Sequence, residues 1–122
     1  DLDRSTAFFA TMGFSINRKF SDENASCVVI SSEIYIMLVA EPFFATFTQK
    51  DIVDATRGTE VIFTLSADSR ERVDAMVDDA LAAGGQPSND AVDHGYLYGR
   101  SFQDVDGHLW EVMWTDPTAA QG

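Results

Sequence analysis

The sequence predicts an α+β fold, and three features of the chain carry that prediction. Apolar residues recur at helical spacing in two segments, residues 1–12 and 68–83. Several shorter runs alternate with period two, as strands do when they bury one face. The order helix, glycine stop and three strands occurs twice along the chain. We therefore expect one domain over residues 1–122 that is built from two similar halves.

The first half is predicted to begin with a helix over residues 1–12. Asp1 or Asp3 is placed to cap this helix or to complement the positive end of its dipole, and Gly13 ends it. Residues 34–40 are apolar at nearly every position, so we expect a strand that is covered on both faces. Alternation predicts the strands of this half over residues 14–20, 25–31 and 34–40.

A long connection, residues 41–58, follows and is rich in phenylalanine. It contains Phe43, Phe44 and Phe47. Such a cluster is an anchor that pins the connection, a lid over a pocket or a dimer contact, and the anchor is the commonest of the three.

The second half opens with a strand over residues 60–66 and contains the clearest helix, residues 68–83. Asp68 with Glu71 resembles a capping box, and the glycine pair 84–85 supplies the stop. Pro87, in the run that follows the helix, predicts either an edge strand or a strand that has the proline at its first position. The strands that follow the helix are expected over residues 86–92, 96–103 and 109–115.

The turn at residues 104–108 joins the last two strands, and its Asp-Gly step suits a tight reversal. In the last strand Leu109, Glu111 and Met113 share one face, because side chains alternate along a strand. The opposite face carries Trp110, Val112 and Trp114. A buried, unpaired carboxylate costs several kcal/mol, so Glu111 either meets water or lines a cleft as a ligand.

Composition limits the classes of partner. The 122 residues carry 8 basic and 20 acidic side chains, a net charge of −12, which disfavours nucleic acid and anionic membrane surfaces. The lone Cys27 lies in an apolar run, so we expect its side chain to be buried as a small hydrophobic group. No apolar run reaches membrane-spanning length, and no leader opens the chain, so we expect a cytoplasmic protein. Residues 117–122 read as a frayed tail.

Two stretches resemble a known family. Residues 1–14, with Asp1-Leu2-Asp3-Arg4-Ser5, Phe8-Phe9 and Met12-Gly13-Phe14, and residues 104–111 are similar to the vicinal oxygen chelate superfamily of glyoxalases, bleomycin-resistance proteins and extradiol dioxygenases. The resemblance implies two βαβββ modules, here residues 1–48 and 58–116, whose sheets curl into a cup that dimerisation completes. We therefore expect a homodimer. The first strand of module one would precede Asp1 and is missing from this sequence.

In enzymes of this superfamily a divalent metal inside the cup chelates adjacent substrate oxygens and acts as a Lewis acid. Carried over by position, Glu111 matches the carboxylate ligand of the last strand. Glu60 opens the strand that should carry a second ligand, although a solvated residue is the commoner role there. The corresponding place in module one is near Met37, which is no ligand for a hard cation. Nickel, zinc, manganese and iron are the metals that the resemblance allows, and a protein without metal is the alternative.

Other candidate residues carry weaker signals, and none is identified as catalytic. Tyr98 and Arg100 share one face of their strand, where Arg100 either binds an anionic group of the substrate or pairs with a surface acid. Phe43 and Phe47 are candidates for an apolar pocket wall. His94 and His108 lie in turns, where histidine is usually solvated.

Two functions follow from these observations. The first is a metal-dependent lyase, isomerase or dioxygenase of the glyoxalase type, acting on a small oxygenated substrate with Glu111 as metal ligand. The second is a metal-free protein that sequesters an antibiotic-like small molecule in an aromatic pocket.

Overall fold

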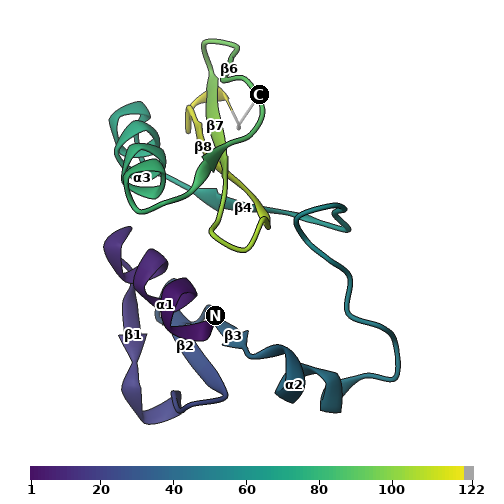
Figure 1. Ribbon diagram of the computed structural model, residues 1–122. Helices are drawn as coiled ribbons and strands as arrows, with labels where there is room; N and C mark the ends of the chain where they lie inside the picture. The colour runs from purple at the N-terminus through teal and green to yellow at the C-terminus, as the bar shows by residue number, and fades with distance from the viewer. Residues whose placement is uncertain (120–122) are drawn as a thin grey trace. The chain divides into compact units, whose positions relative to one another are not determined.

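The computed structural model describes residues 1–119, and the chain divides into two compact units (Figure 1). Unit 1 is Asp1–Asp54 and unit 2 begins at Ala55. The division falls in the connection between the two modules that the sequence predicts.

Unit 1 begins with helix α1 (Leu2–Thr11), capped by the Asp1 carboxylate, which accepts a hydrogen bond from the Arg4 N–H at 3.0 Å. Gly13 ends the helix at φ +102°, a backbone conformation that glycine adopts without steric cost. Phe8 and Phe9 are 2% and 1% exposed and anchor the helix. The predicted helix, its cap and its stop are confirmed.

Three antiparallel strands, in the order β1-β2-β3, form the sheet of unit 1. The first is shorter than predicted, because residues 18–20 form a 3₁₀ turn, η1. The Asn17 side chain accepts a hydrogen bond from the Lys19 N–H at 3.1 Å, which favours this turn over further strand pairing. The elements are β1 (Ser15–Asn17), η1 (Arg18–Phe20), β2 (Ala25–Val29) and β3 (Tyr35–Val39).

The last strand of unit 1, β3, lies at a sheet edge and is not covered on both faces. Tyr35 is 64% exposed and Met37 is 40% exposed, so this expectation was wrong for the described chain. A continuous apolar run predicts burial only when neighbouring elements cover both sides of the strand, and periodicity does not reveal those neighbours.

The Phe-rich connection contains two short helices that its sequence pattern does not predict. They are α2 (Glu41–Phe44) and η2 (Ala45–Phe47), with a proline in the first turn, where its missing N–H costs nothing. The Phe43 and Phe47 rings meet edge to face with centroids 5.0 Å apart. Phe47 is still 61% exposed, so the aromatic cluster packs mainly on itself.

Unit 2 contains a sheet in the order β4-β8-β7-β5, with β6 also paired to β7. Strands β4 and β8 are parallel, and β8 and β7 form the predicted hairpin. The predicted strand over residues 86–92 is split in two, and its proline lies in the edge strand β5. The strands are β4 (Ile62–Ser66), β5 (Gln86–Pro87), β6 (Val92–Asp93), β7 (Leu97–Gln103) and β8 (Leu109–Thr115).

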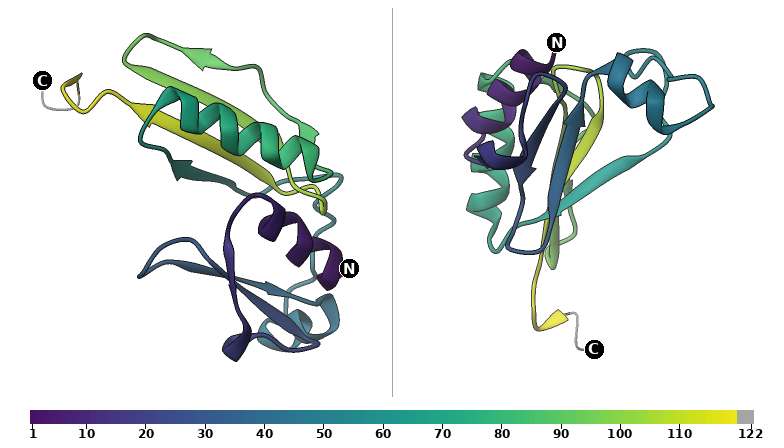
Figure 2. Two further views of the ribbon diagram at one scale, coloured as in Figure 1. Left: turned by 90° about the vertical axis from the view of Figure 1, so that its left-hand side faces the viewer. Right: turned by 90° about the horizontal axis from the view of Figure 1, so that it is seen from below.

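Helix α3 (Arg70–Ala82) packs on one face of this sheet, as Figure 2 shows in its left view. The residue that caps it is Ser69, whose hydroxyl accepts a hydrogen bond from the Arg72 N–H at 3.0 Å, so the predicted cap at Asp68 was wrong. The core beneath the helix is fully buried and consists of Val73, Val77, Ala80, Phe102 and Val112, each 0% exposed.

Arg70 ties the start of α3 to the β6–β7 hairpin. Its guanidinium donates two hydrogen bonds to the Asp93 carboxylate, both 2.9 Å, and one to the Gly95 carbonyl at 2.8 Å. The same group lies 5.1 and 5.2 Å from the ring centroids of Tyr98 and Trp114. Hydrogen bonds from Arg70, then from the Gly95 N–H, hold the pKa of Asp93 at about 2, below its ordinary 3.8.

We expect an NMR titration of the Asp93 carboxyl to show a midpoint at about 2. The substitution Arg70→Gln should return the midpoint toward 3.8. Because the pKa is lower in the folded state, the ion pair stabilises the fold above the ordinary pKa, and this contribution is lost as pH falls toward 2. Arg72→Gln is the matched control, and a midpoint that moved equally in both variants would contradict the pairing.

No helix within residues 1–119 is long and apolar enough to cross a membrane. The predicted tail begins with a turn in which the Asp116 carboxylate accepts from the Thr118 N–H and hydroxyl, at 2.9 and 2.8 Å. Residues 120–122 of that tail lie outside the described part of the chain.

Candidate functional site

Glu111 lies in the middle of β8 on the sheet face opposite α3. The cross-strand partners of Glu111 are Thr64 on β4 and Ser101 on β7. The Thr64 hydroxyl donates a hydrogen bond to Glu111 Oε2 at 3.3 Å. Trp110 and Val112, which flank Glu111 in sequence, are 3% and 0% exposed on the α3 side. The predicted division of the two faces of β8 is therefore confirmed.

A small cavity of about 80 Å³ opens beside Glu111. Met113 covers Gly99 on its floor, because a Cβ at Gly99 would overlap Met113 Sδ. On its wall, the Ser101 hydroxyl accepts from the Asn89 N–H at 2.8 Å and donates to the Asn89 carbonyl at 3.1 Å. The lining of the cavity thus includes two acidic residues, Glu111 and Asp90, together with neutral oxygen donors and a thioether.

The carboxylate of Glu111 makes no ion pair among residues 1–119. Its side chain is half-buried, and the hydrogen bond from Thr64 is long. Partial burial penalises a charge that has no opposite charge nearby, so such a carboxylate favours a cation at the cavity.

Tyr98 and Arg100 lie on the other face of the sheet, toward α3. The Tyr98 hydroxyl donates to Asp74 Oδ1 at 2.6 Å. The Arg100 guanidinium donates to Asp74 and Asp78 at 3.1 and 2.9 Å. The hydrogen bond from Tyr98, followed by that from Arg100, lowers the pKa of Asp74. The guanidinium thus pairs with helix acids and not with Glu111.

The remaining candidates lie on other elements of the chain. Glu60 precedes β4 by two residues and is exposed. Phe43 and Phe47 belong to the helical connection of unit 1. The structure instead groups Glu111 with Thr64, which shares its strand face with Glu60, and with Ser101, Asn89 and Asp90, which were not predicted as site residues. Side-chain alternation along each strand could have placed Thr64 and Ser101 on the same face as Glu111. Alternation within one strand does not reveal the register between strands.

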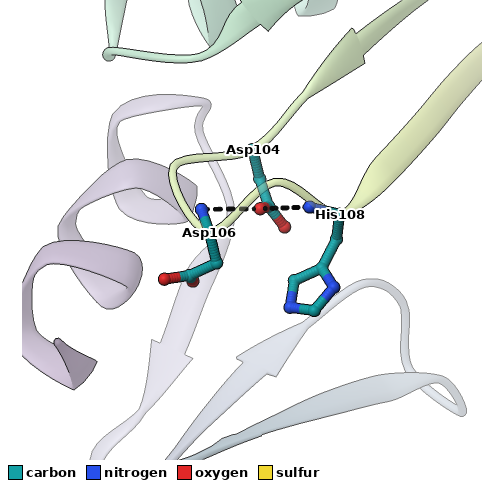
Figure 3. Close-up of side chains that lie close together, drawn as sticks. All are labelled: Asp104, Asp106 and His108. Carbon is teal, nitrogen blue, oxygen red and sulfur yellow. Dashed lines mark hydrogen bonds between the residues drawn. The ribbon is translucent and has the colours of Figure 1, made fainter. Parts of the chain in front are cut away.

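A second group of possible metal ligands lies in the β7–β8 turn. Ligand atoms of Asp104, Asp106 and His108 fall within 4.8 Å of one another, the only such group of three in the described residues (Figure 3). The Asp104 carboxylate, however, already accepts three hydrogen bonds. Its Oδ1 accepts from the Asp106 and His108 N–H groups at 2.9 and 3.0 Å, and Oδ2 from Trp110 Nε1 at 2.9 Å.

These hydrogen bonds to the Asp104 carboxylate hold the turn in shape. A metal ion bound there would have to compete with three hydrogen-bond donors. Gly107 completes the turn at φ +93°, where a Cβ would come within 2.9 Å of the Ala55 carbonyl oxygen. The Asp-Gly reversal predicted from the sequence is confirmed, with Asp104 as its side-chain acceptor.

The donor set at Glu111 fits a hard cation better than a soft one. Carboxylate, hydroxyl and amide oxygens suit manganese, magnesium or ferrous iron, whereas zinc and nickel prefer nitrogen or sulfur. Glu111 is the third residue of β8, and the third residue of β3, the last strand of unit 1's sheet, is Met37. At this position unit 2 therefore offers a carboxylate, and unit 1 has no ligand for a hard cation at the matching position.

Solved structures with the same fold span most of this chain. A hypothetical protein from S. aureus, SA1046, is 27% identical with a TM-score of 0.79, covering 93% of this chain and 85% of its own. A glyoxalase/bleomycin resistance protein/dioxygenase family enzyme from Burkholderia phytofirmans is 18% identical with a TM-score of 0.76, covering 94% and 91%. The fosfomycin resistance protein FosX from Listeria monocytogenes is 19% identical with a TM-score of 0.66, covering 93% and 82%.

No curated protein matches the sequence. The sequence profile of one family matches residues 1–112, almost the whole chain. That match agrees with the hairpin, the two capped helices and the two sheets described above. The chain belongs to the glyoxalase/bleomycin resistance protein/dioxygenase superfamily.

Proposed function

We propose that the protein is a metal-dependent lyase or isomerase of the glyoxalase type, which acts on a small oxygenated substrate with Glu111 as a metal ligand. One observation supports it most directly: a half-buried carboxylate faces a cavity among oxygen donors and has no cationic partner within residues 1–119. The names of the structural relatives include a family enzyme and a fosfomycin resistance protein, which agree with this class of activity.

In this proposal Glu111 holds the cation and the Thr64 hydroxyl orients the carboxylate. A bound divalent cation would supply Lewis acidity toward substrate oxygens. Met113 would present an apolar floor, and the Asn89–Ser101 pair would keep the cavity wall in place. A single carboxylate does not hold a divalent cation tightly, so further ligands are needed, and Asp90 of the same cavity is one candidate. Glu60 remains a proposed ligand, and we further propose a cytoplasmic homodimer.

Metal titration tests the role of Glu111. We expect calorimetry to show binding of manganese or ferrous iron, with affinity lowered about a hundredfold or more in Glu111→Gln, because loss of a charged ligand removes both a bond and its Coulomb attraction. Glu71→Gln, an exposed acid in the first turn of α3, is the matched control. Glu60→Gln reports whether that residue is a ligand. Equal affinity in wild type and Glu111→Gln would overturn the proposal.

A second candidate function is sequestration of an apolar or cationic small molecule without metal. It is supported by the exposed aromatic cluster of unit 1, in which Phe43, Phe44 and Phe47 are 38%, 43% and 61% exposed, and by the net charge of −12. Thermal-shift screening with cationic aromatic compounds distinguishes the two, because a ligand at a hundredfold excess over its Kd stabilises the fold by about 2.7 kcal/mol. Stabilisation that survives Glu111→Gln and is lost in Phe47→Ala would select sequestration.

A further inference from the structure

A second polar cavity lies in unit 1, between the start of α1 and the segment that joins η1 to β2. Its volume is about 190 Å³, room for about six water molecules at the liquid's ~30 Å³ each. The wall carries charges of both signs, Asp3 and Asp22 on one hand and Arg18 on the other. Hydroxyl groups supply the remaining polar lining.

Ser26 lines this cavity from β2 and is the clearest sign that a ligand belongs there. Ser26 is 4% exposed, and its hydroxyl has no hydrogen-bond partner among the described residues. A buried hydroxyl without a partner is destabilising, so native structures rarely keep one without a function or a bound molecule.

The hydrogen-bonding capacity of the other lining residues shows which groups are available. Ser21 and Thr6 use their hydroxyls to donate to the Asn17 and Leu2 carbonyls, both at 2.7 Å. The Asp22 carboxylate uses only Oδ1, which accepts from the Asn24 and Ala25 N–H groups at 2.8 and 3.1 Å.

Two charged side chains of the cavity have no ion-pair partner among the described residues. Neither Arg18 nor Asp3 forms an ion pair within residues 1–119. By contrast, Arg70 and Arg100 of unit 2 are both paired with acids. The cavity therefore presents an unpaired guanidinium, the Asp3 carboxylate, Asp22 Oδ2 and the Ser26 hydroxyl to whatever enters it.

We propose that this cavity binds a small zwitterion of the free amino acid type. Arg18 would take the carboxylate in bidentate fashion, Asp3 and Asp22 would take the ammonium group, and Ser26 would bond to either. A simple anion would meet two carboxylates, and a simple cation would meet the guanidinium. The absence of an aromatic ring from the lining disfavours a sugar, which usually stacks on one. This site is independent of the one around Glu111.

NMR of the ¹⁵N-labelled full chain, without added metal, tests the proposal with glycine, alanine, serine and aspartate. We expect at least one to bind with a Kd below about 10 mM and to shift the Ser26 and Arg18 signals. Two blocked forms of the amino acid that binds serve as control ligands. Its carboxamide lacks the carboxylate, and its N-acetyl derivative lacks the ammonium group. Both should bind at least about tenfold more weakly, since each loses one charge-assisted pair.

Two variants locate the site. Arg18→Gln should weaken binding about tenfold or more, whereas Lys19→Gln, its exposed neighbour outside the cavity, should not. Ser26→Ala should weaken binding but leave the thermal midpoint of the free protein unchanged or higher, because it removes an unpartnered hydroxyl. The proposal is overturned if no amino acid binds, if the blocked forms bind equally well, or if Arg18→Gln leaves affinity unchanged.

Discussion

Replacing Asp104 by alanine is expected to lower the free energy of unfolding by about 3–5 kcal/mol. The carboxylate is 4% exposed and accepts hydrogen bonds from two backbone N–H groups and the Trp110 indole. Alanine removes all three bonds at once and releases the turn that sets the register of β7 with β8. Urea unfolding followed by circular dichroism measures the change.

Two comparisons make the Asp104 prediction specific. Asp104→Asn keeps one oxygen for the two backbone donors but turns a second donor toward Trp110, so a smaller loss of about 1–3 kcal/mol is expected. Asp79→Ala, at an exposed acid on α3, should change stability by less than about 0.5 kcal/mol. The loss in Asp104→Ala should be the same with and without a chelator. A loss seen only with metal present would show that the turn is a metal site instead.

Replacing Phe102 by alanine should also cost about 3–5 kcal/mol. Its ring is 0% exposed beneath α3 and stacks on Trp110 with centroids 6.3 Å apart and planes inclined by 3°. The change removes a large side chain from a site that helix and sheet enclose, so the cavity it leaves cannot collapse fully.

Phe63 is the natural control because it touches the same indole from β4, with centroids 5.0 Å apart, yet is 45% exposed. Phe63→Ala should cost only about 1 kcal/mol, because water already reaches much of its surface. Calorimetric or denaturant unfolding of the two variants in parallel tests the difference. Equal losses would mean that Trp110, rather than enclosure beneath α3, carries the stability.

Local chemistry made much of the fold predictable. Asp1 caps α1, Gly13 stops it, and the alternation in β8 assigned Trp110 and Val112 to the core and Glu111 to the opposite face. Where two local signals competed, the sequence predicted the wrong element boundary. Ser69 rather than Asp68 caps α3, and the Asn17 side chain turns the chain into η1 before the strand is complete.

The candidate site was less predictable, because it depends on which strands become neighbours. Tyr98 and Arg100 were correctly placed on one face, but only the position of α3 directs them to Asp74 and Asp78. The Thr64 hydroxyl lies beside Glu111 through the parallel register of β4 with β8, over a separation of 47 residues, whereas Ser101 reaches it across the β7–β8 hairpin. No periodicity within a single segment encodes that register.

The sequence by itself determined the two long helices, most strands, the final hairpin and the carboxylate at the centre of β8, since capping, turn chemistry and side-chain alternation act over a few residues. Tertiary structure alone decided that Asp104 is only 4% exposed, that Arg70 binds the β6–β7 hairpin, and that the Ser26 hydroxyl lies in a polar cavity without a hydrogen-bond partner among residues 1–119. Those outcomes depend on burial and on contacts between distant segments, which local residue chemistry does not specify.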